Sequence, residues 1–351
     1  MHIPDGYLSP STCAILYAGA APFWYVSLRR LRRLLATRVI PLLSVFAAFS
    51  FVVMMFNLPL PGGTTGHAVG MAIASIVLGP WASILAISIA LAIQALFFGD
   101  GGITALGANC FNMAVAGSLA AYAIYRGIAG SCPLTSRRRV AAAGIAGYLS
   151  INIAALLAAI EFGIQPLLFR DASGAPLYAP YPLKIAIPAM MAGHLTVAGL
   201  AEMVLTAGLV AWLGRSHPSL LRATAPGAPT SDDTNDPHAA FGWSAVRPLL
   251  VRLAVLLLLT PLGILAVGSA WGEWSPRDLA AVSAHREPPA RVPPGLERLS
   301  SVWTAPFPAY APPFLRSASF GYLLSAAFGS GLILLMAAAG DRVLSGRQRS
   351  G

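Results

Sequence analysis

The side chains best suited to bind a transition metal in this sequence are its six histidines, one of which stands at position 2. In a free N-terminus of the form NH2-X-His, the α-amine, the amide nitrogen of residue 2 and its imidazole can close fused chelate rings around one ion. The amide must lose its proton to bind, which requires a strongly Lewis-acidic late divalent ion such as Ni²⁺ or Cu²⁺, with Co²⁺ somewhat less able. Met1 and His2 therefore predict a nitrogen chelate for such an ion.

A fourth nitrogen would complete a square-planar set, and His67 is the candidate, with an ordinary loop histidine as the alternative. It follows a glycine-rich loop at 61–66, where the missing Cβ atoms allow the backbone to approach closely. The tail would reach it by folding back at Pro4-Asp5-Gly6, a strong turn signal. The remaining loop histidines lack such a context and are expected to be solvated: His217, His238 and His285.

The composition places the chain in a membrane. Its 351 residues are 56% hydrophobic and only 10% charged, with a mean hydropathy of +0.69, whereas soluble domains carry about 25% charged residues. Long unbroken apolar runs also argue against a β-barrel, whose strands alternate over about ten residues. We therefore expect an all-α integral membrane protein and not a soluble enzyme.

The formal net charge of +10 does not indicate a nucleic-acid partner. All but one of the 23 basic residues are arginines, and they cluster at the ends of apolar runs, as the positive-inside rule describes. Lys184, the single lysine, is not part of a phosphate-binding glycine loop, so this sequence carries no P-loop ATPase site. Cys13, Cys110 and Cys132 are widely spaced and predict no disulfide framework.

Apolar runs of about 17–25 residues can each cross a hydrocarbon core of ~30 Å. Such runs, together with one short segment that ends at Gly79-Pro80, predict seven spans, a polar gap and two more spans: 11–28, 39–57, 67–79, 81–98, 104–125, 140–162, 184–213, 248–270 and 317–338. Arginines concentrate after the first, fifth and seventh spans and at the end of the chain. That asymmetry predicts a cytoplasmic C-terminus and places Met1 outside.

Two domains follow from this pattern. Residues 1–214 are predicted to form a seven-span bundle, joined by a flexible cytoplasmic linker at 215–246 to a two-span hairpin at 247–351. The outer loop of the hairpin, about 271–316, carries aromatic residues that we expect at the membrane interface and packed on the first domain. These aromatics are Trp271, Trp274, Trp303, Phe307 and Tyr310.

Polar residues inside the predicted spans are few, and each is costly enough in a bilayer to need a reason. The candidates are Gln94, Asn109, Asn112, His194 and Glu202. Glu202 follows His194 by eight residues, which places both on nearly the same helix face. They could form a relay, brace the ligand loop or bond between helices. We favour bracing.

Several blocks in residues 1–214 together resemble the CbiM/NikM family, the substrate-binding membrane component of cobalt and nickel energy-coupling-factor (ECF) transporters. They read MHIPDGYLSPSTCA (1–14), NLPLPGGTTGHAVG (57–70) with LGPWASIL, QALFFGDGGITALGANCFNMAVAG (94–117) and GHLTVAGLAEMVLT (193–206). The second region, with AWGEWSPRDLAAVSA and GYLLSAAFG, is similar to the small CbiN/NikN-like (PDGLE-type) component. Pro293-Pro294-Gly295-Leu296-Glu297 lacks the acid usual in that motif, which weakens a metal-binding role for this loop.

The resemblance implies a ligand set and partners. In the family the metal is held by the amine of the first residue, the amide and imidazole of the second residue and a histidine of the glycine-rich loop. These residues correspond to Met1, His2 and His67. Asn109 lies in a matching block, where hydrogen bonds would orient the ligands. His194 and Glu202 also match, without being direct ligands on that basis. The implied partners are two ATP-binding subunits and a membrane coupling (Q/T-type) subunit, whose ATPase closure moves the whole binding domain.

We therefore predict a metal-uptake component in the plasma membrane of a bacterium or archaeon. It would capture Ni²⁺ or Co²⁺ on the outer face, deliver it to the cytoplasm and need no organic cofactor. Square-planar nitrogen ligation mildly favours nickel, without deciding the physiological metal. Two alternatives are a membrane metal-dependent hydrolase that uses His194, Glu202 and a metal-bound water, and a metal-sensing scaffold that does not transport. The hydrolase would lack an H-E-x-x-H helix.

Overall fold

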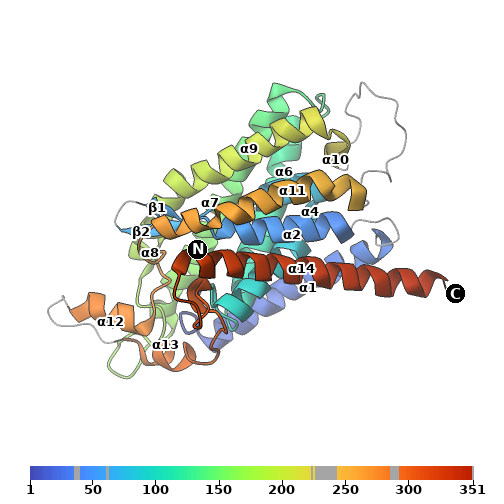
Figure 1. Cartoon of the computed structure of the whole chain (residues 1–351). Helices are drawn as coiled ribbons and strands as arrows, with labels where there is room; N and C mark the ends of the chain where they lie inside the picture. Colours follow the sequence, from blue (N-terminus) through green and yellow to red (C-terminus); the bar gives the residue numbers. More distant parts are fainter. Residues whose placement is uncertain (35–39, 61–62, 223, 226–242, 285–291, 350–351) are drawn as a thin grey trace.

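The computed structural model describes residues 1–34, 40–60, 63–222, 224–225, 243–284 and 292–349 (Figure 1). The described chain is mostly helical, as predicted, and its long helices run roughly side by side. A small hairpin of strands and the short helices α12 and α13 lie at one end of the molecule, and the C-terminus lies at the other. Most of the predicted linker, His238 and His285 lie outside the described residues.

The first domain begins with a helix that the N-terminal tail precedes. Its elements in order are α1 (Pro10–Leu34), α2 (Ile40–Met54), β1 (Leu58–Leu60), β2 (Thr64–Gly66), α3 (Met71–Leu78), α4 (Pro80–Ile93), η2 (Gln94–Phe98), α5 (Leu106–Asn109), η3 (Cys110–Gly117), α6 (Ser118–Ala129), α7 (Arg137–Leu168), α8 (Leu183–Gly193), η4 (His194–Ala198), α9 (Gly199–Ser216) and α10 (Ser219–Arg222). Strands β1 and β2 pair antiparallel, with Leu58 opposite Gly66. This hairpin directly precedes His67 in the chain.

Three π-helical segments interrupt the long helices of this domain. Segment η2 begins at Gln94, η3 directly follows Asn109 and contains Asn112, and η4 begins at His194. A π-helical turn holds one more residue than an α-helical turn, so it changes the direction of the side chains that follow, and such turns are frequent at functional sites. Four of the polar residues singled out in the spans therefore lie in or beside these segments.

The second domain covers the part of α2 that α3 and α4 of the first domain do not. It consists of α11 (Trp243–Leu259), η6 (Thr260–Leu265), α12 (Pro276–Ala284), α13 (Pro294–Leu299), η7 (Pro308–Tyr310) and α14 (Ala318–Arg349). Both α11 and α14 pack against α2, and every residue of α2 is buried. A helix that is apolar on all sides is stable only when other helices or lipid cover it. The Tyr322 hydroxyl also donates a hydrogen bond to the Met55 carbonyl, 2.9 Å away.

Five stretches of the described chain are long and apolar enough to cross a membrane: 80–98, 137–168, 183–216, 246–265 and 318–340. They confirm a multi-pass helical protein but not the predicted count of nine spans. With eight residues, α3 is only ~12 Å long. Helix α2 has 15 residues and falls below the length of a full span. Asn109 and Asn112 lower the hydropathy of the predicted fifth span.

The aromatic loop of the second domain packs on the first domain, as predicted. Trp271 and Trp274 lie 5.0 and 6.1 Å from the Tyr181 ring. The Trp303 indole donates a hydrogen bond to the Leu96 carbonyl at 2.9 Å. Tyr310 stacks on Phe98 with the ring centroids 4.8 Å apart. The two domains therefore share one packed core at this end of the molecule.

The contact between α14 and α2 depends on a glycine. A Cβ atom at Gly329 would collide with the buried Phe51 ring. We expect Gly329→Ala to lower the free energy of unfolding by about 1–3 kcal/mol, because the ring has no space to move into. Gly331→Ala in the same helix meets no atom within 4 Å and is the matched control. Thermal unfolding in detergent measures both variants, and equal midpoints would contradict this packing.

Candidate metal centre

The N-terminal tail is buried against the first domain. Met1, His2, Ile3 and Tyr7 are each at most 5% exposed. The Asn109 side chain holds Ile3 through two hydrogen bonds, accepting from its N–H at 2.8 Å and donating to its carbonyl at 3.1 Å. The Ile3 carbonyl also accepts from the Gly102 N–H at 2.8 Å. The main-chain groups next to His2 are thus fixed in place, which limits where its imidazole can lie.

The predicted turn at Pro4-Asp5-Gly6 directs the tail. The Asp5 carboxylate accepts hydrogen bonds from the N–H groups of Ile103 and Thr104 at 3.2 and 2.7 Å. Gly6 has a φ of +87°, and a Cβ there would collide with the Leu296 main chain of the second domain. Position 6 therefore requires glycine both for its backbone conformation and for the close approach of α13.

The structure brings Met1, His2 and His67 together. The His2 and His67 rings are stacked, with their centroids 5.0 Å apart and an angle of 30° between their planes. Both rings are buried, and so is Met1. His67 lies in the loop between β2 and α3, directly after the hairpin. The hairpin therefore positions the His67 ring, and the folded N-terminal tail positions the His2 ring.

Two carboxylates that we did not single out from the sequence lie at the same place. The Met1 amine is 3.0 Å from Glu273 Oε1, and His2 Nδ1 is 2.7 Å from Asp100 Oδ1. One ligand atom from each of His2, Asp100 and Glu273 falls within a 4.8 Å cluster. Asp100 lies between two predicted spans in the quoted block 94–117, and Glu273 lies in the outer loop of the second domain. Acidic residues are rare in this chain, with 13 in all, so the positions of Asp100 and Glu273 could have indicated a role from the sequence.

Asp100 is held by further polar groups from both domains. The Tyr310 hydroxyl donates a hydrogen bond to Asp100 Oδ2 at 2.5 Å, and Gln94 Nε2 donates to the same oxygen at 3.2 Å and to the Tyr310 oxygen at 2.8 Å. Burial opposes ionisation of Asp100, but the His2 and His67 imidazoles and the Tyr310 hydroxyl together outweigh it and hold the pKa of this carboxyl well below its ordinary value. The carboxylate is therefore a fixed negative charge beside His2.

The hydrogen bonds of the histidines determine which ring nitrogens are available. His67 Nδ1 lies 3.0 Å from the Ala68 carbonyl, which can only accept, so Nδ1 carries the proton and Nε2 holds the lone pair. Burial, the His2 ring and the Met1 amine lower the pKa of His67 to about 3. The ring is consequently neutral near pH 7, the form that binds a metal. Among the described residues, His2 Nε2 is buried without a hydrogen-bond partner.

Glu202 contacts the His67 loop, not the imidazoles. Its carboxylate accepts hydrogen bonds from the N–H groups of Val69 and Gly70 at 2.8 and 2.9 Å, and from Ala72 at 3.4 Å. These N–H groups stand at the start of α3, where a helix leaves its donors unpaired and favours a negative charge. The geometry is that of the brace considered above, with the carboxylate occupied by main-chain donors.

His194 is not brought into this imidazole pair. Its Nδ1 lies 2.8 Å from the Met190 carbonyl. It lines a cavity of about 250 Å³ that Met1, Thr65 and Trp271 also line. His194 therefore stands beside the Met1 end of the site, while Asn109 and Glu202 support the backbone next to His2 and His67.

Comparison with known proteins identifies the protein family of this chain. Residues 2–220 match the family model CbiM, described as the cobalt uptake substrate-specific transmembrane region, and residues 247–345 match the PDGLE domain. The chain belongs to the CbiM family and carries a PDGLE domain in the same polypeptide, which confirms the resemblance seen in the sequence.

Individual relatives cover most or all of the chain. It is 54% identical over 359 residues to the fused nickel transport protein NikMN of Rhodobacter capsulatus, covering 99% of each protein. It is 32% identical over 283 residues to the cobalt transport protein CbiM of Geobacter sulfurreducens, covering 78% of this chain and 74% of that protein. A crystal structure of a transition metal transporter has 50% sequence identity and a TM-score of 0.57, over 61% of this chain and 92% of the other.

Glu202 provides a test of the brace. In Glu202→Gln an NH2 group replaces one accepting oxygen and leaves a buried main-chain N–H unpaired, which costs about 1–3 kcal/mol. We expect the affinity for Ni²⁺, measured by calorimetric titration, to fall about 10- to 100-fold as the His67 loop shifts. Glu297→Gln, at an exposed carboxylate of α13, is the control. Unchanged Ni²⁺ affinity in Glu202→Gln would show that the His67 loop keeps its position without this carboxylate.

Proposed function

We propose that this chain is the substrate-specificity component of an ECF-type metal importer, which captures Ni²⁺ or Co²⁺ on the outer face of the membrane and delivers it to the cytoplasm. Four nitrogens would bind the ion: the Met1 amine, the His2 amide nitrogen, the His2 imidazole and the His67 imidazole. The observation that carries the proposal is the buried stack of His2 on His67 with the Met1 amine beside it. Membership of the CbiM family supports it independently.

In this proposal, the bound ion replaces two contacts that the free site makes. The fused chelate uses His2 Nδ1, because that nitrogen closes a six-membered ring with the amide nitrogen of the same residue. His2 Nδ1 must therefore leave Asp100, and the Met1 amine must leave Glu273. Among the described residues, the His2 N–H has no hydrogen-bond partner that would resist its loss of a proton. The two carboxylates remain close and offset the charge of the ion.

Nickel is the substrate that we favour. Four nitrogens in one plane give the strong square-planar field from which a d⁸ ion gains most. The relative that matches over 99% of both chains is named as a nickel transport protein. Oxygen-seeking ions such as Mg²⁺ and Ca²⁺ suit a nitrogen set poorly. Cobalt would bind the same ligands less tightly.

We further propose that this chain works with separate subunits and has a defined orientation in the membrane. ATP would be hydrolysed by two separate ATP-binding subunits, which a membrane coupling subunit links to this chain, because the sequence carries no P-loop. The N-terminus would face outward and the C-terminus the cytoplasm, in a bacterial or archaeal plasma membrane. The arginine pattern supports this orientation. The position of the tail and the C-terminus at different ends of the bundle agrees with it.

Calorimetric titration of Ni²⁺ and Co²⁺ tests the chelate. We expect one tight site in the full chain, with Ni²⁺ bound more tightly than Co²⁺. His2→Ala, His67→Ala and a form with an acetylated α-amine should each weaken binding by more than about 100-fold, since losing a ligand costs more than losing a residue that orients one. His217→Ala, which alters a histidine beside Trp212 instead, is the matched control. Full affinity in the acetylated form would exclude the amine as a ligand and redirect the search to His194.

Metal accumulation in cells separates transport from sensing. Cells that express the chain with both ATP-binding subunits and the coupling subunit should accumulate radioactive nickel. Accumulation should cease when the ATP-binding subunits lack a functional phosphate-binding loop. Tight binding by the purified chain without accumulation in the complete set would instead support the metal-sensing scaffold.

A further inference from the structure

An arginine lies inside one of the candidate membrane spans, in a groove between the two domains. Arg252 is on α11, six residues after the start of the span 246–265, which corresponds to about 9 Å along the helix. No carboxylate of the described residues forms an ion pair with it. An unpaired charge at such a position is costly, and it requires an explanation in terms of the groups around it.

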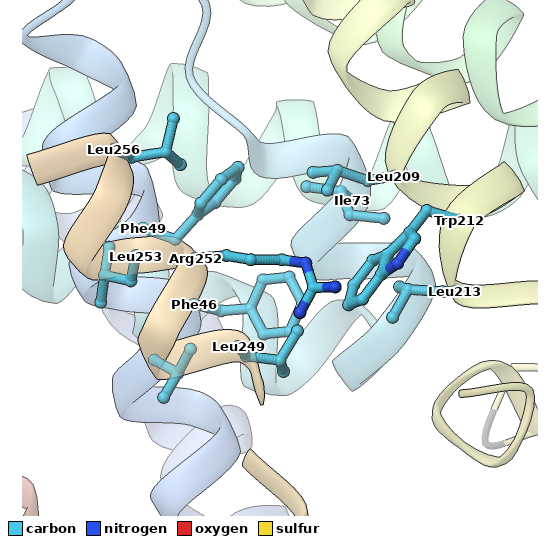
Figure 2. A pocket seen from close by; sticks show the side chains of 11 residues that line it. Phe46, Phe49, Ile73, Leu209, Trp212, Leu213, Leu249, Arg252, Leu253 and Leu256 are labelled. Atoms are coloured by element: carbon cyan, nitrogen blue, oxygen red, sulfur yellow. The ribbon is translucent and has the colours of Figure 1, made fainter. Parts of the chain in front are cut away.

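The groove around Arg252 is apolar. Its lining comes from α2, α3, α9 and α11 and includes Phe46, Phe49, Ile73, Leu209, Trp212 and Leu253. Figure 2 shows the Arg252 side chain reaching across from α11 toward Trp212 on α9. The guanidinium carbon lies 3.9 Å from the centre of a Trp212 ring. The groove thus combines a hydrophobic surface with one cation.

The contacts of the guanidinium leave donors free. The Trp212 ring lies against the guanidinium and offers no acceptor atom to the N–H groups along its edge. Nη1 donates to the Pro248 carbonyl at 2.9 Å, and four further N–H donors remain. An oxyanion with two oxygens could accept from this edge in the bidentate manner typical of phosphates. Arg215, three residues after Trp212 on α9, adds positive charge on the same side of that helix.

The groove opens beside a surface suited to lipid. Val251, Val255 and Leu258 of α11 are 58%, 52% and 66% exposed. Such large exposed apolar side chains on a membrane helix face acyl chains. A lipid molecule lying along α11 would therefore meet an apolar lining and a cation in one place, as basic pockets between membrane helices do when they bind anionic headgroups.

We propose that the groove between α9 and α11 binds one anionic phospholipid of the phosphatidylglycerol type. Its phosphate oxygens accept hydrogen bonds from the free donors of Arg252, and an acyl chain lies along α11 against Val255 and Leu258, beside the groove. The lipid would occupy the junction of the two domains, and its binding does not depend on the metal site.

Native mass spectrometry of the full chain tests this site. The protein is purified from vesicles that hold equal amounts of phosphatidylglycerol and phosphatidylcholine, and the retained lipids are counted. We expect one phosphatidylglycerol to be retained in preference to phosphatidylcholine. Arg252→Gln should reduce its retention about five-fold, the effect of one basic residue on an anionic lipid. Arg252→Lys should keep part of the preference, because the charge stays while the planar fork is lost.

Arg247→Gln is the matched control, since Arg247 is on the same helix but does not line the groove. It should retain the lipid as the unmodified chain does. Nickel binding by each variant reports that the chain is folded. Equal retention of phosphatidylglycerol by Arg252→Gln and the unmodified chain would overturn the proposal. Equal retention of both lipids, or occupation by a second copy of the chain seen as a dimer without lipid, would overturn it as well.

Discussion

The burial of the polar N-terminal tail is the constraint on which the candidate metal centre depends. A charged amine, an imidazole and several main-chain groups leave water when this tail folds into the bundle, and each needs a partner there. Asn109 and Gly102 satisfy Ile3, residues 103 and 104 satisfy Asp5, and Glu273 and Asp100 pair with Met1 and His2. The tail consequently has a position in which most of these groups are satisfied, while the His2 N–H and His2 Nε2 have no hydrogen-bond partner among the described residues. That position sets the His2 ring on His67.

The second domain completes this environment. It supplies Glu273 to the Met1 amine, Tyr310 to Asp100 and the Trp274 carbonyl to the Tyr7 hydroxyl. Burial, together with the Asp100 charge, raises the pKa of Tyr310. The phenol therefore keeps its proton and donates a hydrogen bond to Asp100. The backbone of Tyr310 has a φ of +59°, a strained conformation for a residue other than glycine. The loop holds this conformation because aromatic contacts with Phe98 and Tyr322 fix the ring.

The sequence predicts the parts of the site that are local and misses those that are assembled from a distance. Met1 and His2 are adjacent, and His67 follows a recognisable loop, so their residue types and spacing indicate a chelate. Asp100, Glu273 and Tyr310 lie far from residues 1–67 in the sequence, so the rarity of acidic residues could draw attention to the two carboxylates but no short spacing indicates which groups the three side chains contact. Glu202 is intermediate, because its membrane position indicated a role while its partners, the N–H groups at the start of α3, required the structure.

The helices likewise divide into those that the sequence predicts and those that only the structure defines. Hydropathy predicts the long helices well, since a run such as 137–168 has no alternative to a membrane span. It assigns the short α3 and the fully enclosed α2 less well, because neighbouring helices cover them and relax the length that lipid would demand. The π-helical segments at Gln94 and His194 have no signature in composition at all. They arise where packing and polar contacts redirect a helix.

The packing of α11 and α14 on α2 also joins the two domains into one body. Because α2 belongs to the first domain and part of its cover to the second, the two domains cannot separate without exposing apolar side chains of α2. Fusion in one polypeptide keeps them at a one-to-one ratio and raises the effective concentration of each at the other to about the millimolar range. The joined body therefore carries Val255 and Leu335, both exposed, on its outer surface. The cross-section that the membrane must accommodate is that of both domains.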